Sequence, residues 1–279
     1  MGAVDYARKL ARSFVFYSIC LVTYLTSVLV ITLYVGLVFP VYLWNKPAVV
    51  KVTNWMFFTC FNLIGFVFNR SWKCVMLNDL PEDYKKKQRI YMFNHLSSSD
   101  PFLVTHIGMK LPLVCTYKDS LHKIPTTRLM MGLSGQLAIK FMYDKANDRK
   151  IPVRDSVGKL MKDCKDAMDQ GFNLCVYPEG KRSRDGVLQE FKDGFFRFAV
   201  EHGVEIQPCA ISNSAALWPL KSTFLIGSGL AYINIGKPIS PEGKTVEQLK
   251  HATRKAIYDA LRACPTFNPA LETVPELED

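Results

Sequence analysis

Two long stretches without a charged side chain open the sequence, at residues 13–45 and 52–69. A helix needs about 20 apolar residues to cross a bilayer, so the first stretch is long enough, and it is too long for the apolar part of a cleaved signal peptide. The second is marginal, at about 1.5 Å of rise per residue, and it contains the polar residues Asn54, Thr59 and Asn62. We expect a two-helix membrane motif: a hairpin that dips into or crosses a membrane and returns the chain to its starting side.

The composition changes after residue 70 to that of an ordinary soluble domain. We therefore expect three parts: a membrane-associated helical hairpin at 1–70, an α/β domain at 71–265, and an acidic tail at 266–279. Within the hairpin, Pro40 is expected to end or kink the first helix near Phe39, because proline disrupts a helix interior. The eight cysteines lack the close spacing of a zinc knuckle, so we predict no bound metal.

The formal net charge of +10 favours an anionic partner, which is nucleic acid, anionic lipid or a phosphorylated substrate. The apolar start favours lipid, and the sequence shows no zinc-finger or RNP-type pattern. We therefore expect a membrane and a phosphorylated substrate as partners, and no nucleic acid.

The remaining sequence alternates short apolar runs with helical patterns. Six runs predict strands, at 89–94, 112–117, 137–143, 173–177, 205–211 and 229–235. Apolar residues at helical spacing predict helices at 154–170, 193–202 and 245–263. This alternation indicates an α/β fold with a mixed, largely parallel sheet flanked by helices.

A polar motif, NHLSSSDP, follows the first of these strands and runs from Asn94 to Pro101. Asp100 followed by Pro101 predicts a helix start with Asp100 as N-cap, which leaves His95 on a loop. A short loop brings the carboxylate towards the imidazole, where it fixes the tautomer and leaves the other ring nitrogen to accept a proton. The same spacing also fits a capping aspartate beside an unrelated histidine.

A second motif, YPEGKRSRDG, follows another predicted strand at 177–186. Gly180 allows a tight turn. Three cations stand within four positions, among them Lys181 and Arg182, and Ser183 adds a hydroxyl. Because arginine and lysine together bind phosphate well, the motif is a candidate phosphate site. A solvated basic turn is the alternative interpretation.

Together the two motifs resemble those of the lysophosphatidate acyltransferases, the 1-acyl-sn-glycerol-3-phosphate acyltransferases of the glycerolipid acyltransferase superfamily. The family pattern N-H-x-x-x-x-D corresponds to Asn94, His95 and Asp100, and F-P-E-G-T-R corresponds to YPEGKR at 177–182. The resemblance extends to a block around Pro208, and the apolar N-terminus also fits the family.

The resemblance implies transfer of a fatty acyl chain from acyl-CoA to the sn-2 hydroxyl of 1-acyl-glycerol 3-phosphate, giving phosphatidate for phospholipid biosynthesis. It implies that His95 deprotonates the acceptor hydroxyl and that Asp100 orients His95. The alkoxide then attacks the thioester directly, with acyl-CoA as co-substrate and without a metal, an acyl-enzyme or another cofactor. The substrate-binding residues are expected to be Asn94, Glu179, Gly180, Lys181, Arg182, Ser183, Lys140 and Pro208.

Two departures from the family pattern concern the acceptor. Lys181 replaces a threonine, which keeps a donor and adds a charge. Where the family often has G-x-x-F-I-x-R, Phe141 occupies the arginine position, and Lys140 replaces that arginine only if the strand bulges. Lys145 and Arg149 are the other candidates. The acceptor therefore stays open among lysophosphatidate, glycerol 3-phosphate, dihydroxyacetone phosphate and other lysophospholipids.

Two other functions compete with acyl transfer. A hydrolase would use Ser97, Ser98 or Ser99 as nucleophile with His95, but the sequence has no G-x-S-x-G elbow. A non-catalytic membrane protein would need no His95. The family's usual location favours the endoplasmic reticulum membrane with the catalytic domain facing the cytosol, which fits reduced cysteines.

Overall fold

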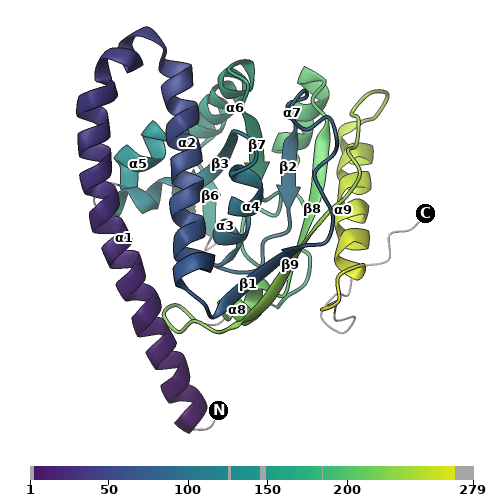
Figure 1. Cartoon of the computed structure of the whole chain (residues 1–279). Helices are drawn as coiled ribbons and strands as arrows, with labels where there is room; N and C mark the ends of the chain where they lie inside the picture. The colour runs from purple at the N-terminus through teal and green to yellow at the C-terminus, as the bar shows by residue number, and fades with distance from the viewer. Residues whose placement is uncertain (1–2, 125–126, 145–148, 184, 221, 268–279) are drawn as a thin grey trace.

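The computed structural model describes residues 3–124, 127–144, 149–183, 185–220 and 222–267 (Figure 1). In chain order the elements are α1 (Ala3–Trp44), α2 (Lys46–Asn62), η1 (Leu63–Phe68), β1 (Trp72–Met76), β2 (Ile90–Phe93), α3 (Asp100–Leu103), α4 (Thr105–Gly108), β3 (Leu113–Lys118), η2 (Asp119–Lys123), α5 (Thr127–Leu133), β4 (Leu137–Ile139), β5 (Phe141–Asp144), β6 (Arg149–Pro152), α6 (Arg154–Asp169), β7 (Asn173–Val176), α7 (Gly194–His202), β8 (Ile206–Ser212), α8 (Ser214–Leu217), β9 (Gly229–Ile235) and α9 (Val246–Arg262).

Seven strands form one sheet in the order β1-β9-β8-β2-β7-β3-β4, and every pairing is parallel except that of β8 with β9. The central strand β2 places Tyr91 opposite Cys175 of β7 and Gln207 of β8. A separate antiparallel ribbon joins β5 to β6. The prediction of a mixed, largely parallel sheet flanked by helices is confirmed.

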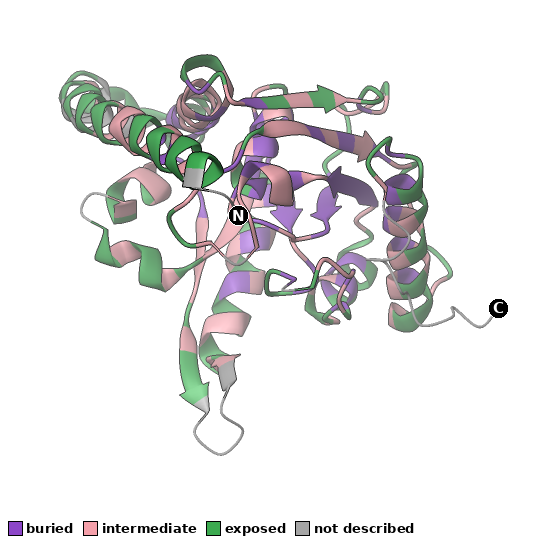
Figure 2. Ribbon diagram, turned by 90° about the horizontal axis from the view of Figure 1, so that it is seen from below, coloured by how far each residue is buried: buried purple, intermediate pink, exposed green. Residues whose placement is uncertain are grey.

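The side chains of β2 alternate between two apolar cores, one on each face of the sheet. Ile90 and Met92 pack with residues of α6, α7 and α9. Tyr91 and Phe93 pack with residues of α1, α2, α3 and α4. Figure 2 shows the buried strands in the middle, with the largely exposed helix α1 along one side. The two N-terminal helices therefore contribute to the cover of one face.

The N-terminal helices form the expected hairpin (Figure 1), and both pack against the α/β domain. Phe16 of α1 is 2% exposed and packs on Trp72, with ring centroids 4.9 Å apart. Asn54 of α2 is fully buried and donates to the carbonyls of Leu113 and Ser134, both at 2.8 Å. One of the polar residues that made the second apolar stretch a marginal span thus binds the domain.

A close approach of α2 to α4 depends on Gly108. A Cβ built on Gly108 would lie 2.4 Å from Cγ of Phe58, far inside van der Waals contact. Phe58 is 1% exposed in this position. The contact between these helices therefore admits no side chain at residue 108.

Within the described residues, one continuous helical stretch, Lys46–Phe68, is long and apolar enough to cross a membrane. Large apolar side chains are also exposed along α1, including Leu33, Leu37 and Trp44. The hairpin is observed, while its place in a bilayer stays a prediction.

Of the two outcomes expected at Pro40, an end of the first helix near Phe39 is wrong, because α1 continues through the proline to Trp44, and a kink there stays a prediction. The chain reverses at Asn45 instead. The side chain of Asn45 caps α2 by accepting a hydrogen bond from the N–H of Ala48, and a proline stands in the first turn. The helix thus continues past the proline, and the chain turns where the two signals of a new helix start stand together.

The run at 137–143 forms two strands rather than the one predicted, since β4 pairs with β3 and β5 pairs with β6. Lys140 lies at the break. Its N–H donates to Oγ of Ser156 at 2.9 Å, and its carbonyl accepts from the N–H of Val153 at 3.0 Å. These bonds take the chain out of the ladder with β3.

The other predicted strands correspond to β2, β3, β7, β8 and β9, and the predicted helices to α6, α7 and α9. The sequence analysis missed β1 and β6, each only four or five residues long, and the short helices α4, α5 and α8. Periodicity over so few residues gives no clear signal.

Candidate active site

The side chain of Asn94 extends the pairing of β2 with β8 beyond the last strand residue. Its Nδ2 donates to the carbonyl of Ile211 at 2.9 Å, and its Oδ1 accepts the N–H of the same residue at 2.7 Å. Asn94 is 1% exposed. The amide, expected to bind substrate, is therefore used to fix the point at which the chain leaves the sheet, one residue before His95.

His95 and Asp100 lie together as the short loop predicted. Nδ1 of His95 is 2.7 Å from Oδ2 of Asp100, and the same oxygen accepts the N–H groups of Leu96 and Ser97, both at 2.8 Å. Asp100 is the first residue of α3 and Ser99 is its N-cap, so the predicted N-cap is wrong by one residue. The carboxylate points back to the loop that precedes it instead of capping the helix that follows.

The imidazole of His95 is held flat against a second ring. Tyr177 stacks on it with centroids 4.1 Å apart and an interplanar angle of 22°. The His95 side chain is 19% exposed, so solvent and substrate can reach it. With Nδ1–H donating to the Asp100 carboxylate, Nε2 is the basic nitrogen. This is the geometry of a general base with an orienting carboxylate.

The three serines of the loop are engaged away from His95. The hydroxyls of Ser97 and Ser99 donate to backbone carbonyls at 2.6 and 2.9 Å. The hydroxyl of Ser98 accepts from the guanidinium of Arg182. In the described structure these hydroxyls contact other groups and form no hydrogen bond with His95.

Glu179 is 1% exposed, and backbone groups occupy both of its oxygens. Oε1 accepts the N–H of His95 at 2.6 Å, and Oε2 accepts the N–H of Gln189 at 3.0 Å. Burial raises the pKa of Glu179 to about 7, against the lowering effect of these two hydrogen bonds. The carboxylate contacts the loop of His95 and is not presented to solvent.

Gly180 and Ser183 shape the turn that carries the cations. Gly180 has φ +69°, and its N–H donates to the carbonyl of Tyr177 at 3.0 Å, a conformation that favours glycine. Ser183 is 3% exposed; its hydroxyl donates to Asp185 at 2.8 Å and accepts the N–H of Gly186 at 3.0 Å. These two candidate binding residues have clear structural roles.

Exposed cations gather at the edge of the sheet where the parallel strands β3 and β7 end. Lys181 and Arg182 follow β7 and are both exposed. Lys118 is the last residue of β3, and its Nζ lies 5.1 Å from the ring centroid of Phe141. The sequence analysis missed Lys118, although a lysine directly after a predicted strand in an α/β fold was a usable signal.

Lys140 is exposed, and the described structure contains no hydrogen bond or ion pair that joins its side chain to His95 or Arg182. The alternative candidate Lys145 lies outside the described residues, and the structure describes the backbone of Arg149 but not its side chain.

Pro208 is buried in β8, opposite Met92 of β2. It lies next to Gly236, where a Cβ would come within 2.9 Å of the proline Cγ. Its described contacts are with the sheet, and none of them reaches His95.

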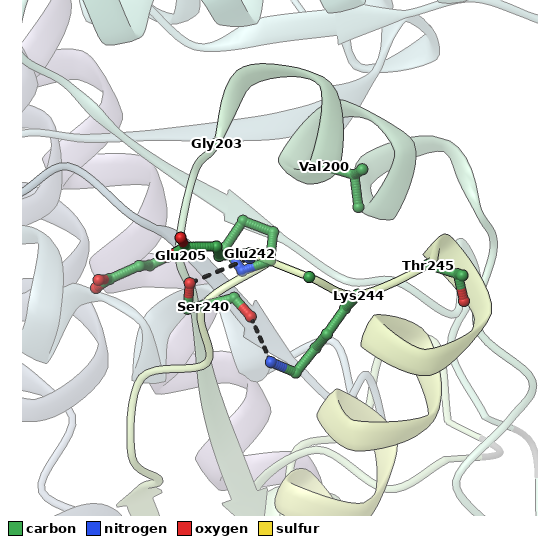
Figure 3. A pocket seen from close by; sticks show the side chains of 9 residues that line it. Val200, Gly203, Glu205, Ser240, Glu242, Lys244 and Thr245 are labelled. Atoms are coloured by element: carbon green, nitrogen blue, oxygen red, sulfur yellow. Dashed lines mark hydrogen bonds between the residues drawn. The ribbon is translucent and has the colours of Figure 1, made fainter.

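An open pocket of about 690 Å³ lies at the other end of the sheet, lined by residues that include Val200, Glu205 and Lys244 (Figure 3). Glu205 precedes β8, whereas His95 follows β2, and the two strands are parallel. The pocket is therefore separated from His95 by the length of the sheet, and it does not belong to this site.

Comparisons with known proteins agree with the motifs. A family model described as Acyltransferase matches residues 73–212. A 1-acyl-sn-glycerol-3-phosphate acyltransferase from Chlamydomonas reinhardtii is 29% identical over 175 residues, covering 63% of this chain and 49% of the relative. One from Saccharomyces cerevisiae is 28% identical over 197 residues, covering 68% and 60%. The chain spans about half the length of the first curated relatives that it matches.

A solved structure shares the fold. The crystal structure of the 1-acyl-sn-glycerophosphate acyltransferase PlsC from Thermotoga maritima superposes with a TM-score of 0.63 at 21% identity. The match covers 93% of this chain and 98% of that chain, so the N-terminal hairpin falls largely within the shared fold.

Proposed function

The chain belongs to the acyltransferase family, and we propose that it transfers a fatty acyl chain from acyl-CoA to the free sn-2 hydroxyl of 1-acyl-glycerol 3-phosphate, giving phosphatidate. The observation that carries the proposal is the His95–Asp100 pair, with Nδ1 bound to the carboxylate at 2.7 Å and the ring partly exposed. The names of the similar curated proteins support the acceptor.

The chemistry follows from this pair. Nε2 of His95 takes the proton of the acceptor hydroxyl while that oxygen attacks the carbonyl carbon of the thioester. Asp100 stabilises the imidazolium that forms. Collapse of the tetrahedral intermediate breaks the C–S bond, and the CoA thiolate takes the proton back from His95. The reaction uses acyl-CoA as co-substrate and needs no further cofactor.

The phosphate of the acceptor binds, in this proposal, to the exposed cations beside His95. Arg182 offers a bidentate guanidinium, and Lys181 adds a point charge. Lys118 takes over the role of the arginine that the family often has at the position of Phe141, since its ammonium lies over that ring. Lys118 therefore replaces Lys140 as our candidate for this role.

The chain is proposed to act at a membrane. Support comes from the apolar stretch Lys46–Phe68 and from the exposed apolar surface of α1. In this proposal residues 1–70 attach the protein to the membrane and residues 71–265 carry out the chemistry. The endoplasmic reticulum, with the catalytic domain on the cytosolic side, is the proposed location. Of the acidic tail proposed at 266–279, residues 268–279 lie outside the described structure.

An acyl-transfer assay on the detergent-solubilised full chain tests the function. Oleoyl-CoA serves as donor, and lysophosphatidate is compared with glycerol 3-phosphate, dihydroxyacetone phosphate and several lysophospholipids. We expect phosphatidate from the wild type and a loss of turnover of about 10³-fold or more in His95→Ala, because a general base typically contributes about 10²–10⁴-fold. A parallel assay with an acyl carrier protein thioester identifies the donor.

Each other result has a defined meaning. If the protein prefers another acceptor, the proposed mechanism stands. Lys118 and Phe141 would then mark the acceptor pocket that has changed. Retained turnover in His95→Ala contradicts the base assignment. Absence of transfer to every acceptor contradicts the enzyme function.

A further inference from the structure

His95 is held at both of its backbone polar groups by the second motif. Its N–H donates to Oε1 of Glu179 at 2.6 Å, and its carbonyl accepts the N–H of Ser183 at 2.8 Å. The other carboxylate oxygen accepts the N–H of Gln189, ten residues further along the same segment. One buried side chain thus joins the loop of the base to the loop that carries the cations.

We propose that Glu179 is a positioning residue that keeps His95 in its reactive orientation, and that protonation of Glu179 loosens this hold and lowers turnover. The inference rests on the acyl-transfer function proposed above and departs from the acceptor-binding role that the family resemblance implied. A side chain that is 1% exposed, with both oxygens engaged by backbone donors, has no free face for a headgroup.

Glu179 can accept both backbone hydrogen bonds only when its carboxyl group is ionised. A carboxylate accepts hydrogen bonds at both oxygens, whereas a protonated carboxyl presents an O–H donor at one of them. After protonation, one of the two backbone N–H groups faces a donor and loses its acceptor. Since either amide belongs to a loop of the site, the ring of His95 then loses part of its fixed position against Tyr177.

The charged groups around Glu179 favour titration in the neutral range. Burial raises the pKa of Glu179 to about 7; the backbone bonds from His95 and Gln189 lower it, the imidazole of His95 also lowers it, and the Asp100 carboxylate raises it. From α9, the guanidinium of Arg254 interacts with Glu179; burial lowers the pKa of Arg254 and Glu179 opposes that shift. Activity should therefore fall as the pH drops through about 7.

Loss of activity in this range is distinct from unfolding. The folded-state pKa of Glu179 lies above its ordinary value, so this group stabilises the fold most at low pH, and that contribution is lost as the pH rises through about 7. Acidification from pH 8 to pH 6 thus strengthens the fold at this residue while it weakens the hold on His95.

Kinetics of Glu179→Gln test the proposal. The glutamine keeps the shape and places an NH₂ donor where one oxygen stood, which imitates the protonated acid at every pH. At pH 8 we expect kcat to fall about 10- to 100-fold, with the acceptor KM within twofold, as for a group that supports the transition state alone. The matched control Glu190→Gln changes an 82% exposed side chain on the same segment and should leave both constants unchanged.

The pH profile gives the second readout. In the wild type, the fall of kcat/KM towards acid pH should depend on one more protonation than in Glu179→Gln. Glu179 titrates only in the wild type, whereas the other groups titrate in both proteins. Ionisation of the acceptor phosphate affects both proteins equally and cancels in the comparison. Identical acid limbs, or an acceptor KM raised tenfold with kcat unchanged, would overturn the positioning role.

Amide hydrogen exchange tests the hold directly and without turnover. Peptides covering residues 94–100 should exchange at least tenfold faster in Glu179→Gln than in the wild type, with no other segment changed except that of Gln189, whose amide Glu179 also holds; equal exchange at 94–100 overturns the inference even if no acceptor is ever found. If Glu179→Gln does not fold, Glu179→Asp replaces it. This shorter carboxylate reaches only one amide, so kcat should fall while the extra acid-side proton remains, and an unchanged kcat contradicts the proposal.

Discussion

Charged side chains are arranged differently at the two ends of the central sheet: they pair with one another at one end and are exposed at the other. Before β2, Arg89 is 2% exposed and donates to Asp83 at 2.6 Å and to Glu205 at 2.8 Å. Lys87 also donates to Glu205. After the parallel strands, Lys118, Lys181 and Arg182 are exposed, and Oδ1 of Asp100 is buried without a hydrogen-bond partner among the described residues.

This contrast indicates the end of the sheet at which a ligand is expected to bind. Charges that are hydrogen-bonded to one another inside the chain have little left to offer a substrate, and removing one partner destabilises the fold. In the part of the chain that the structure describes, Lys118, Lys181 and Arg182 form no ion pair, so these exposed cations are available to bind an anionic substrate. Substitutions at the two ends should therefore separate into kinetic and stability effects.

The largest effect is expected for Asp100→Asn, about 10²–10⁴-fold in kcat, because an amide facing His95 selects the wrong imidazole tautomer. Steady-state kinetics with saturating donor and acceptor measure it. Asp163→Asn, on the solvent side of α6, is the control and should retain wild-type kcat. A kcat for Asp100→Asn within threefold of the wild type would place Asp100 outside the catalytic pair.

A smaller effect, about 10- to 100-fold in the acceptor KM, is expected for Arg182→Ala, since hydrogen bonds to charged groups contribute about 1.5–3 kcal/mol. The donor KM should change less than twofold. Arg197→Ala, with a side chain 72% exposed on α7, is the matched control. Equal changes in both KM values would contradict the assignment of Arg182 to the acceptor phosphate.

The smallest kinetic effect is expected at the opposite end, for Arg89→Met. Loss of two hydrogen-bonded ion pairs should lower the free energy of unfolding, by less than for fully buried partners because both acids still reach water. Thermal unfolding of the full chain in detergent measures the shift, and KM values should stay within twofold. Altered KM values with unchanged stability would remove the distinction between the two ends.

Much of the fold and the central pair of the site followed from local patterns. The strands that became β2, β7 and β8, and the helices α6 and α9, have clear periodicity, and the short loop between His95 and Asp100 leaves few ways for it to fold. Two motifs in the right order then identified the family.

What the sequence analysis missed depends on contacts between distant residues. Glu179 stands 84 residues from the amide that it holds, and the bonds that place Asn54 against β3 span 59 residues. The break at Lys140 needs Ser156, from the start of α6. Such pairings follow from the packed arrangement of elements and leave no periodic pattern in the chain.

The contact between Gly108 and Phe58 limits how freely the hairpin and the domain can be exchanged between related chains. The phenyl ring of Phe58 occupies the space where a side chain at residue 108 would begin. The hairpin and the domain therefore pack together at a point that requires glycine at residue 108. A chimera that combines the hairpin of one such chain with the domain of another must exchange both residues together. At this contact the two parts can change only together, however separate their compositions look.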